Sequence, residues 1–277
     1  RAFRQVERKV CVTMYNVDPN DVTANKRREA YTQFQMNSES SHLCKCIEAF
    51  YYINKGRLQY WVVTEWGEEG TLDRYLKQNS VIFDDRNYSF ISDIAVGLEY
   101  LYRVLAHQHL RLCPENMVVA KNFQSIYPSI KLQNYGTGDI ISHTCPDPLP
   151  IENVYFVAPE MFLEDYTTKT TDVWSFGILI YWLTVGETPY QTLDIDPIMC
   201  MEQRVPLPLT IISEPDIRDL LSKMLVYDPE GRIEILDVFN HPFITSCKET
   251  RYGRMGNINQ YTPEKKLGEG RYGVVMK

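Results

Sequence analysis

The chain of 277 residues lacks long apolar runs, an excess of basic residues and C-x-x-C cysteine pairs. Its longest apolar stretch, residues 176–185, is much shorter than the roughly 20 residues that cross a bilayer. The sequence therefore predicts no membrane span. The formal net charge of −7 argues against nucleic acid as a partner, because phosphates favour a basic surface.

The cysteines also exclude a disulfide framework. Seven are present, an odd number, and none forms a C-x-x-C pair. This distribution is typical of reduced thiols, and with no secretory or targeting segment visible at either end it predicts a cytoplasmic protein. Cys44 and Cys46 are two positions apart, which places both side chains on one face of an expected strand, where packing is favoured over metal binding.

What the chain does contain is a set of short motifs. Residues 109–116 have the sequence HLRLCPEN. This segment resembles the catalytic loop of protein kinases, H-R-D-L-K-P-E-N, with three letters changed. In the family the loop Asp accepts the substrate proton and the Asn holds magnesium.

Scaffold motifs of the same family follow the loop without change. Residues 157–160 (VAPE) resemble A-P-E, and residues 172–177 (DVWSFG) match D-x-W-S-x-G, which opens a buried helix. The segments GETPY (186–190), DPEGR (228–232) and NHPF (240–243) come next in the order of Ser/Thr kinases. The resemblance implies a buried ion pair between Glu160 and Arg232.

The resemblance implies an α+β protein kinase-like fold with two lobes, a small β-rich N-lobe and a larger, mainly helical C-lobe. Residues 61–67 form an apolar strand that ends in the hinge between the lobes. Residues 71–76 begin with a Thr N-cap and are expected to be helical. Apolar residues recur at helical spacing over residues 88–105, which predicts a core-facing helix.

The positions that carry the chemistry of the family are altered. Arg111 replaces the loop Asp, and a guanidinium has no acceptor for a proton. Cys113 replaces the loop Lys, and Asn134 replaces the metal-binding Asp of D-F-G. Thr13 stands at the phosphate-binding Lys, and Gln33 stands at its Glu partner in a helix expected over residues 24–35. We therefore expect no catalytic residue at these positions.

Some nucleotide-binding positions are retained. Residues 267–275 contain G-x-G-x-x-G-x-V, the glycine-rich hairpin that covers ATP in kinases. Thr64 provides a small side chain at the gatekeeper position, and apolar residues stand at the positions around the adenine. The resemblance assigns nucleotide contacts to Gly268, Gly270, Gly273, Val275, Cys11, Thr64, Glu65, Gly67 and Val118. Asn116 is the one metal ligand retained, so we expect either no cofactor or weakly bound ATP with little metal dependence.

The glycine-rich hairpin lies at the far end of the chain from the strand that normally follows it. Joining Lys277 to Arg1 gives an ordinary spacing to Thr13, which favours one kinase-like domain over residues 1–277 with a rotated linear order. Its small lobe comprises residues 255–277 and 1–66, and its large lobe residues 67–249. Two alternatives are a tandem array cut at equivalent points and a glycine turn unrelated to the fold.

Two functional hypotheses follow. The first is a pseudokinase, not an enzyme, that acts as a scaffold or allosteric regulator of a protein partner such as an active kinase or its substrate. The second is an unorthodox kinase or other phosphoryl or nucleotidyl transferase that uses displaced residues, with Lys9 and Arg111 as replacement cations. The loss of several charged groups together makes the first the expected function.

Overall fold

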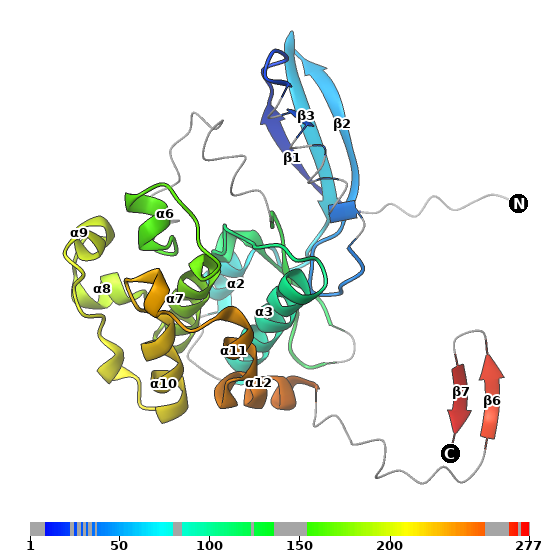
Figure 1. Cartoon of the computed structure of the whole chain (residues 1–277). Helices are drawn as coiled ribbons and strands as arrows, with labels where there is room; N and C mark the ends of the chain where they lie inside the picture. Colours follow the sequence, from blue (N-terminus) through cyan, green and yellow to red (C-terminus); the bar gives the residue numbers. More distant parts are fainter. Residues whose placement is uncertain are drawn as a thin grey trace, which may run out of the picture.

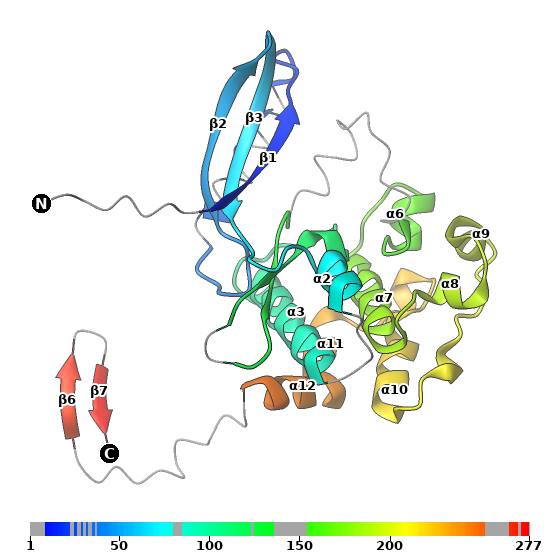
Figure 2. The ribbon, with the colours of Figure 1, turned by 180° about the vertical axis from the view of Figure 1, so that it is seen from behind.

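The computed structural model describes residues 9–22, 25, 26, 29, 32, 35, 36, 38–79, 85–122, 125–135 and 154–252, and the backbone of residues 266–270 and 273–276. These residues form a small sheet lobe and a larger helical lobe (Figure 1). The view from behind shows the same two parts joined beside α2 and α3 (Figure 2).

The small lobe is an antiparallel sheet in the order β1-β3-β2. It comprises β1 (Val10–Asn16), β2 (Cys46–Asn54) and β3 (Arg57–Glu65). One face buries Tyr60, Val62 and Thr64, as the period-2 alternation of a strand requires. Residues 22, 25, 26, 29, 32, 35 and 36 are helical, and from this segment Thr32 accepts a hydrogen bond of 3.0 Å from the Tyr60 hydroxyl.

The large lobe is built around α7 (Thr171–Val185), the helix predicted from the apolar run. Nearly all of its side chains are buried, which explains why its sequence is apolar on every side. Gly186 ends the helix in a left-handed conformation, with φ 94°, a conformation that glycine adopts without strain.

The other helices surround α7 and bury their apolar sides in one continuous core. The core-facing helix predicted over residues 88–105 is α3 (Asp85–Arg103), and the short helix after the hinge is α2 (Leu72–Asn79). The remaining helices are α6 (Pro159–Leu163), α8 (Pro189–Leu193), α9 (Pro197–Glu202), α10 (Pro215–Met224), α11 (Ile235–Asn240) and α12 (Pro242–Tyr252). Short 3-10 turns occur at η1 (Pro114–Asn116), η2 (Leu209–Ile211) and η3 (Pro229–Gly231).

A two-stranded antiparallel ribbon lies on the large-lobe side of the hinge. It pairs β4 (Met117–Ala120) with β5 (Ser129–Leu132), and Val118 lies directly opposite Lys131. The segment before β2 is fixed to this ribbon, because Leu132 N donates to His42 O and Cys44 N donates to Leu132 O. The ribbon therefore connects the catalytic-loop region to the start of the small lobe.

The glycine-rich segment forms a separate antiparallel hairpin, β6 (Lys266–Gly270) with β7 (Gly273–Met276). The sheet order β1-β3-β2 includes neither strand, so the rotated order expected from the sequence is not confirmed. Within the described part of the chain, no helix is both long and apolar enough to span a membrane.

Candidate nucleotide site

A hollow of about 710 Å³ lies where the hinge meets β4 and β5. Its volume falls within the range of small-molecule sites. The residues around it come from both lobes and include several lysines and apolar side chains: Lys9, Cys44, Glu65, Trp66, Glu68, Val118, Ala120, Lys121 and Lys131. We call this hollow the hinge pocket.

An ion pair between the lobes lies at the hinge pocket. Lys131 Nζ, from β5, is 2.8 Å from Glu65 Oε2, at the end of β3. Each side chain is 25% exposed, so the pair is only partly screened by water. Glu65 Oε2 also accepts a 3.3 Å hydrogen bond from Lys45 N. A Lys–Glu pair is therefore present in the pocket, although Thr13 and Gln33 provide neither partner.

Of the predicted adenine positions, Cys11, Thr64 and Gly67 are not among the residues that line this pocket. Cys11 and Thr64 are direct neighbours across β1 and β3, and Glu65 and Val118 line the hollow. Gly67 is so close to β4 that a Cβ built on it would lie 2.0 Å from Val118 Cγ1 and 2.9 Å from Val119 O. The hinge therefore requires glycine at this position, while the nucleotide contact expected of Gly67 stays a prediction.

Burial keeps the cysteines near the pocket protonated. Desolvation, with a smaller effect of Glu65, raises the pKa of the Cys44 thiol to about 12, and burial raises that of Cys46 to about 11. Neutral thiols are poor metal ligands. Both side chains are almost fully buried; the preference for packing over metal binding stays a prediction.

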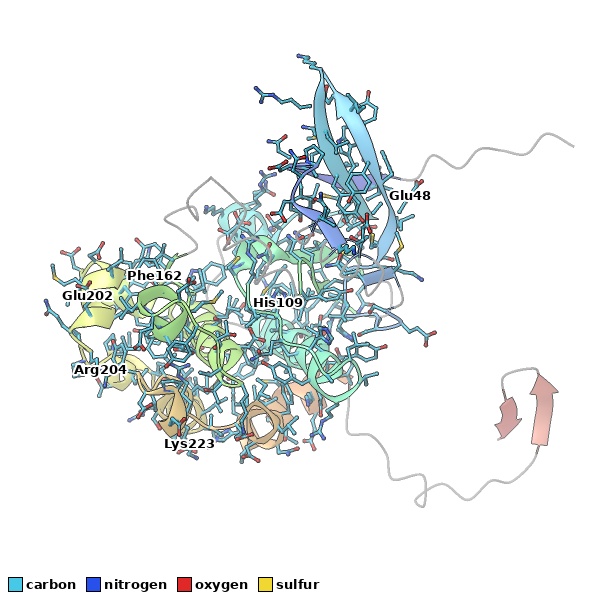
Figure 3. All side chains as sticks on the ribbon, turned by 45° about the horizontal axis from the view of Figure 1, so that its top comes forward. Glu48, His109, Phe162, Glu202, Arg204 and Lys223 are labelled. Atoms are coloured by element: carbon cyan, nitrogen blue, oxygen red, sulfur yellow. The ribbon has the colours of Figure 1, made fainter. Side chains whose placement is uncertain are left out.

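The segment of residues 109–116 is held by Asp172, in the first turn of α7. The two carboxylate oxygens of Asp172 accept hydrogen bonds from His109 N (2.6 Å) and Leu110 N (2.8 Å). The Tyr102 hydroxyl donates a further hydrogen bond of 2.8 Å to Asp172 Oδ2. His109 lies inside the molecule (Figure 3). Its burial lowers the pKa of the imidazole to about 3, so His109 is neutral at physiological pH and has a structural position.

The loop carries one carboxylate. Arg111 stands at the position of the family's base and lines a small hollow with Cys113, Phe156 and Met161. Cys113 is buried, and its pKa is raised to about 12 by desolvation and by Glu115. One oxygen of Glu115 is buried without a hydrogen-bond partner. Since Arg111 cannot accept a proton, Glu115 is the remaining candidate acceptor within the loop.

The two residues at metal-binding positions contact one another. Asn134 Nδ2 donates to Asn116 Oδ1 over 2.8 Å, and Asn116 Nδ2 donates to Arg111 O over 2.8 Å. Both side chains are neutral amides, whereas Mg²⁺ prefers carboxylates. This pair of amides therefore does not fit a tightly held magnesium ion.

Several predicted positions cannot be placed in the site. Gln33 lies outside the described residues. Gln35, two positions later, donates a hydrogen bond of 3.3 Å from Nε2 to Tyr135 O. The backbone of Gly268, Gly270, Gly273 and Val275 belongs to the β6–β7 hairpin. Thr13 lies in β1 opposite Val62, and the residues that line the hinge pocket do not include it.

Comparison with known proteins decides the family. The family model for the protein kinase domain matches residues 3–244. The chain belongs to the protein kinase family. It is 29% identical over 194 residues to a probable serine/threonine-protein kinase of Dictyostelium discoideum, covering 67% of this chain and 22% of that protein.

Two further relatives carry similar names. The protein kinase kin1 of Schizosaccharomyces pombe is 26% identical over 187 residues, covering 67% of this chain and 20% of the relative. The serine/threonine-protein kinase ULK3 of Xenopus laevis is 26% identical over 188 residues, covering 66% of this chain and 39% of the relative. This kinase chain therefore spans less than half the length of the relatives that it matches.

These relatives correct the functional expectation. The sequence predicted a pseudokinase that is not an enzyme, but the matched proteins are named serine/threonine kinases and point to kinase activity. The expected scaffold function is therefore wrong. The physical reason is that phosphoryl transfer depends mainly on positioning and electrostatic stabilisation, so the substitutions at Thr13, Arg111 and Asn134 do not by themselves exclude catalysis.

The sequence analysis missed Lys131 and Cys44 as residues of the pocket. The available signal for Lys131 was its position between Ile130 and Leu132, both fully buried, which places the lysine on the opposite face of a strand. Its partner Glu65 is 66 positions away. Nothing in the local sequence connects the two residues.

Proposed function

We propose that the chain is an ATP-dependent protein kinase of unorthodox composition, which uses displaced residues to phosphorylate Ser or Thr hydroxyls of a protein substrate. The observation that carries the proposal is the hinge pocket, in which Lys131 and Lys9 lie with apolar Val118 and Ala120. Family membership supports ATP as the nucleotide. ATP would supply the transferable phosphoryl group.

Lys131 and Lys9 take over the charge that Thr13 lacks. Ammonium groups bind phosphate as point charges without strict geometry, so a lysine entering from β5 can replace one on β1. Glu65 orients Lys131 at 2.8 Å, as the partner Glu does in the family. Val118 and the backbone of the hinge at Gly67 hold the adenine base of ATP.

Glu115 is proposed as the proton acceptor. In this step Glu115 accepts the proton of the substrate hydroxyl while the hydroxyl oxygen bonds to the γ-phosphorus of ATP and the bond between that phosphorus and ADP breaks. The Glu115 oxygen without a partner is buried and must be uncovered to reach the substrate. Arg111 stabilises the negative charge on the transferred group, as arginines do in related phosphoryl transfers. A positioned base contributes about 100-fold to 10,000-fold, so a poorly placed one lowers the rate without abolishing the reaction.

Nucleotide binding is proposed to be weak and little dependent on metal. The support is the neutral Asn116–Asn134 pair, which offers no carboxylate to a divalent cation. We further propose that the β6–β7 hairpin belongs to the same kinase domain and covers the pocket with Gly268, Gly270 and Gly273. Replacement of Gly270 by Val then weakens nucleotide binding, whereas unchanged affinity contradicts that placement.

The partner is proposed to be a protein substrate, and the location the cytoplasm. The six cysteines of the described residues are all free thiols, which suits a reducing compartment.

The test is transfer of labelled phosphate from ATP to a generic protein substrate by the purified chain, with nucleotide affinity measured in parallel. Lys131→Met should weaken affinity about tenfold, equivalent to about 1.4 kcal/mol, and Glu115→Gln should lower kcat about 100-fold or more with little change in affinity. Lys169→Met is the matched control, since Lys169 is exposed and pairs with Glu234 on the large-lobe surface.

Transfer that is equal in the native chain and in Glu115→Gln would remove Glu115 from the mechanism. The kinase proposal itself fails if the native chain neither binds ATP nor transfers phosphate with any divalent metal. Equal loss of affinity in Lys131→Met and Lys169→Met would show that charge alone, not position in the pocket, is responsible.

A further inference from the structure

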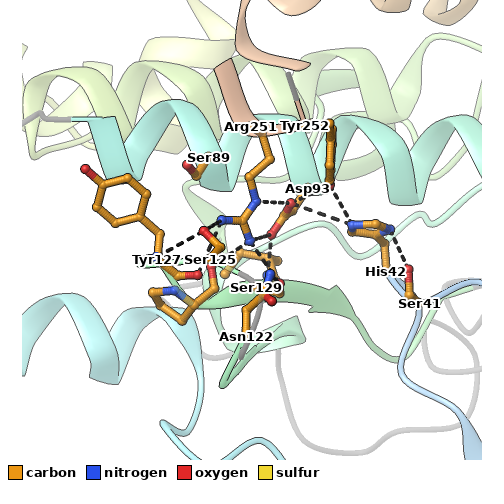
Figure 4. Close-up of polar contacts among 12 residues, drawn as sticks. Ser41, His42, Ser89, Asp93, Asn122, Ser125, Tyr127, Ser129, Arg251 and Tyr252 are labelled. Carbon is orange, nitrogen blue, oxygen red and sulfur yellow. Dashed lines mark hydrogen bonds and ion pairs between the residues drawn. The ribbon is translucent and has the colours of Figure 1, made fainter. Parts of the chain in front are cut away.

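The last residues of α12 take part in a buried polar cluster beneath β5 (Figure 4). Arg251 and Asp93 form its centre, with Arg251 Nη2 and Asp93 Oδ2 3.1 Å apart and side chains only 2% and 0% exposed. Asp93 belongs to α3. The cluster thus joins the C-terminal helix of the large lobe to the helix that packs against the ribbon.

The donors of the Arg251 guanidinium are all used. Nε also bonds Asp93, at 3.1 Å. Nη1 donates to Ser125 Oγ and Tyr127 O, and Nη2 donates to Pro128 O and Ser129 Oγ, over 2.8 to 3.3 Å. A buried charge pair with every donor satisfied fixes one arrangement of its neighbours, because any shift leaves a buried polar atom unpaired.

Tyr252 extends the cluster to the segment before β2. Its hydroxyl lies 2.6 Å from Asp93 Oδ1 and 2.7 Å from His42 Nε2. The backbone oxygen of His42 accepts from Leu132 N over 2.8 Å. One phenol therefore links the end of α12 to the backbone of β5.

The cluster fixes both neighbours of Lys131. On one side, Ile130 N donates to Asp93 Oδ2 over 2.9 Å. On the other, Leu132 is bonded through its N to His42 O and through its O to Cys44 N. Lys131 lies between these two anchored residues, and it is the residue that meets Glu65 in the hinge pocket.

We propose that Arg251 and Tyr252 are positioning residues that hold Lys131 in the hinge pocket, through Asp93 and His42. They lie outside the pocket and act on the nucleotide only through β5. The proposal predicts that changes at the end of α12 alter nucleotide affinity although no residue of α12 lines the pocket. The expected change in nucleotide affinity rests on the proposed nucleotide site, whereas the expected change in the backbone of β5 does not.

The experiment compares Tyr252→Phe and Arg251→Lys with Lys248→Met in the full chain. Lys248 is a matched control because it also ties α12 to α3, through Glu99 at 2.6 Å, while its ammonium group lies over the ring of Phe239 in α11, away from β5 and His42. Amide hydrogen exchange is followed at Ile130, Leu132 and Cys44 and in α7. The dissociation constant of a fluorescent ADP analogue is measured on the same samples.

We expect exchange at Ile130, Leu132 and Cys44 to rise about tenfold in Tyr252→Phe, the effect of losing one hydrogen bond to a charged group on local opening. Exchange in α7 stays unchanged. The affinity for the ADP analogue falls about fivefold, and Lys248→Met changes neither quantity by more than about twofold.

Unchanged exchange in β5 of Tyr252→Phe overturns the proposal. So does an equal rise in Lys248→Met, or a uniform rise that includes α7, because either would show a purely structural role in docking α12. If the native chain binds no ADP analogue, the proposed nucleotide function fails, and the exchange data still decide whether α12 positions β5.

Discussion

Asn134 and Asn116, which stand at the two metal-binding positions of the kinase family, are hydrogen-bonded directly to one another, with Asn134 Nδ2 2.8 Å from Asn116 Oδ1. Asn134 holds this geometry with a positive φ of 57°, which Asn and Asp tolerate better than other side chains. The bond provides the contact that a bridging cation would otherwise make.

Replacing Asn134 by Asp should therefore create metal dependence. The new carboxylate faces an amide oxygen, so a cation is needed between them. We expect ADP with Mg²⁺ to raise the melting temperature of Asn134→Asp by several degrees over ADP with EDTA, since ligand at about 100 times its Kd contributes about 2.7 kcal/mol. The native chain should show little difference. Equal shifts in both proteins would contradict this account of the site.

Removing one partner of the ion pair between Glu160 and Arg232 should strongly destabilise the large lobe. Both side chains are almost fully buried, and two bonds of 2.7 Å join them. Glu160→Gln leaves an uncompensated buried guanidinium and should lower the free energy of unfolding by about 3 to 5 kcal/mol, measured by urea denaturation. The double variant Glu160→Gln/Arg232→Met should lose less than the sum of the single variants. Additive losses would show that the two residues act independently.

Gly67→Ala tests the contact between hinge and ribbon. A Cβ at this position would lie 2.0 Å from Val118 Cγ1, so the hinge must move away from β4. We expect a loss of about 1 to 3 kcal/mol in unfolding free energy together with weaker nucleotide binding. Adding Val118→Ala should restore part of both, although Val119 O still opposes the new methyl group at 2.9 Å. No recovery in the double variant would place the clash elsewhere.

His109 should make stability depend on pH in mildly acidic solution. Its pKa is about 3 in the folded protein, because burial disfavours the charged ring, against 6.5 for an ordinary histidine. Below pH 6.5 the unfolded chain therefore binds a proton that the folded chain does not, and stability falls as pH falls. From pH 7.5 to 5.5 this histidine should cost about 1.4 kcal/mol.

His109→Phe should remove that part of the dependence when unfolding free energies of both proteins are compared at each pH. The Phe ring has no titrating group and replaces a ring whose Nε2 is buried without a partner. If the two proteins lose stability in parallel between pH 7.5 and 5.5, His109 is not the responsible group.

Much of the fold could be predicted from local patterns. The apolar run at residues 176–185 predicted a buried helix, found as α7 (Thr171–Val185). The spacing of apolar residues over 88–105 predicted α3, observed at Asp85–Arg103. Both predictions succeeded because the signals are local: a continuous apolar run for α7, which is buried on every side, and a period of 3.6 residues for α3. The rotated order depends on the β6–β7 hairpin joining β1 and stays a prediction.

The function was predicted less well, and for an instructive reason. The substitutions of motif residues at Thr13, Arg111 and Asn134 predicted a loss of activity, whereas the named relatives point to kinase activity. A motif records which residue stands at one position. It does not record whether a group from another strand can supply the same charge, the role proposed for Lys131 beside Glu65.

The sequence by itself indicated the family through its contiguous motifs and the large-lobe helices through their apolar patterns, while the pair of Glu160 with Arg232, 72 positions apart, was implied by the family resemblance. Only the tertiary structure decided which charges meet in the hinge pocket and beneath β5. Lys131 and Glu65 are 66 positions apart, and Arg251 and Asp93 are 158 apart. Such pairs form because chain folding brings distant, partly or fully buried charges together, where low dielectric makes an unpaired charge costly.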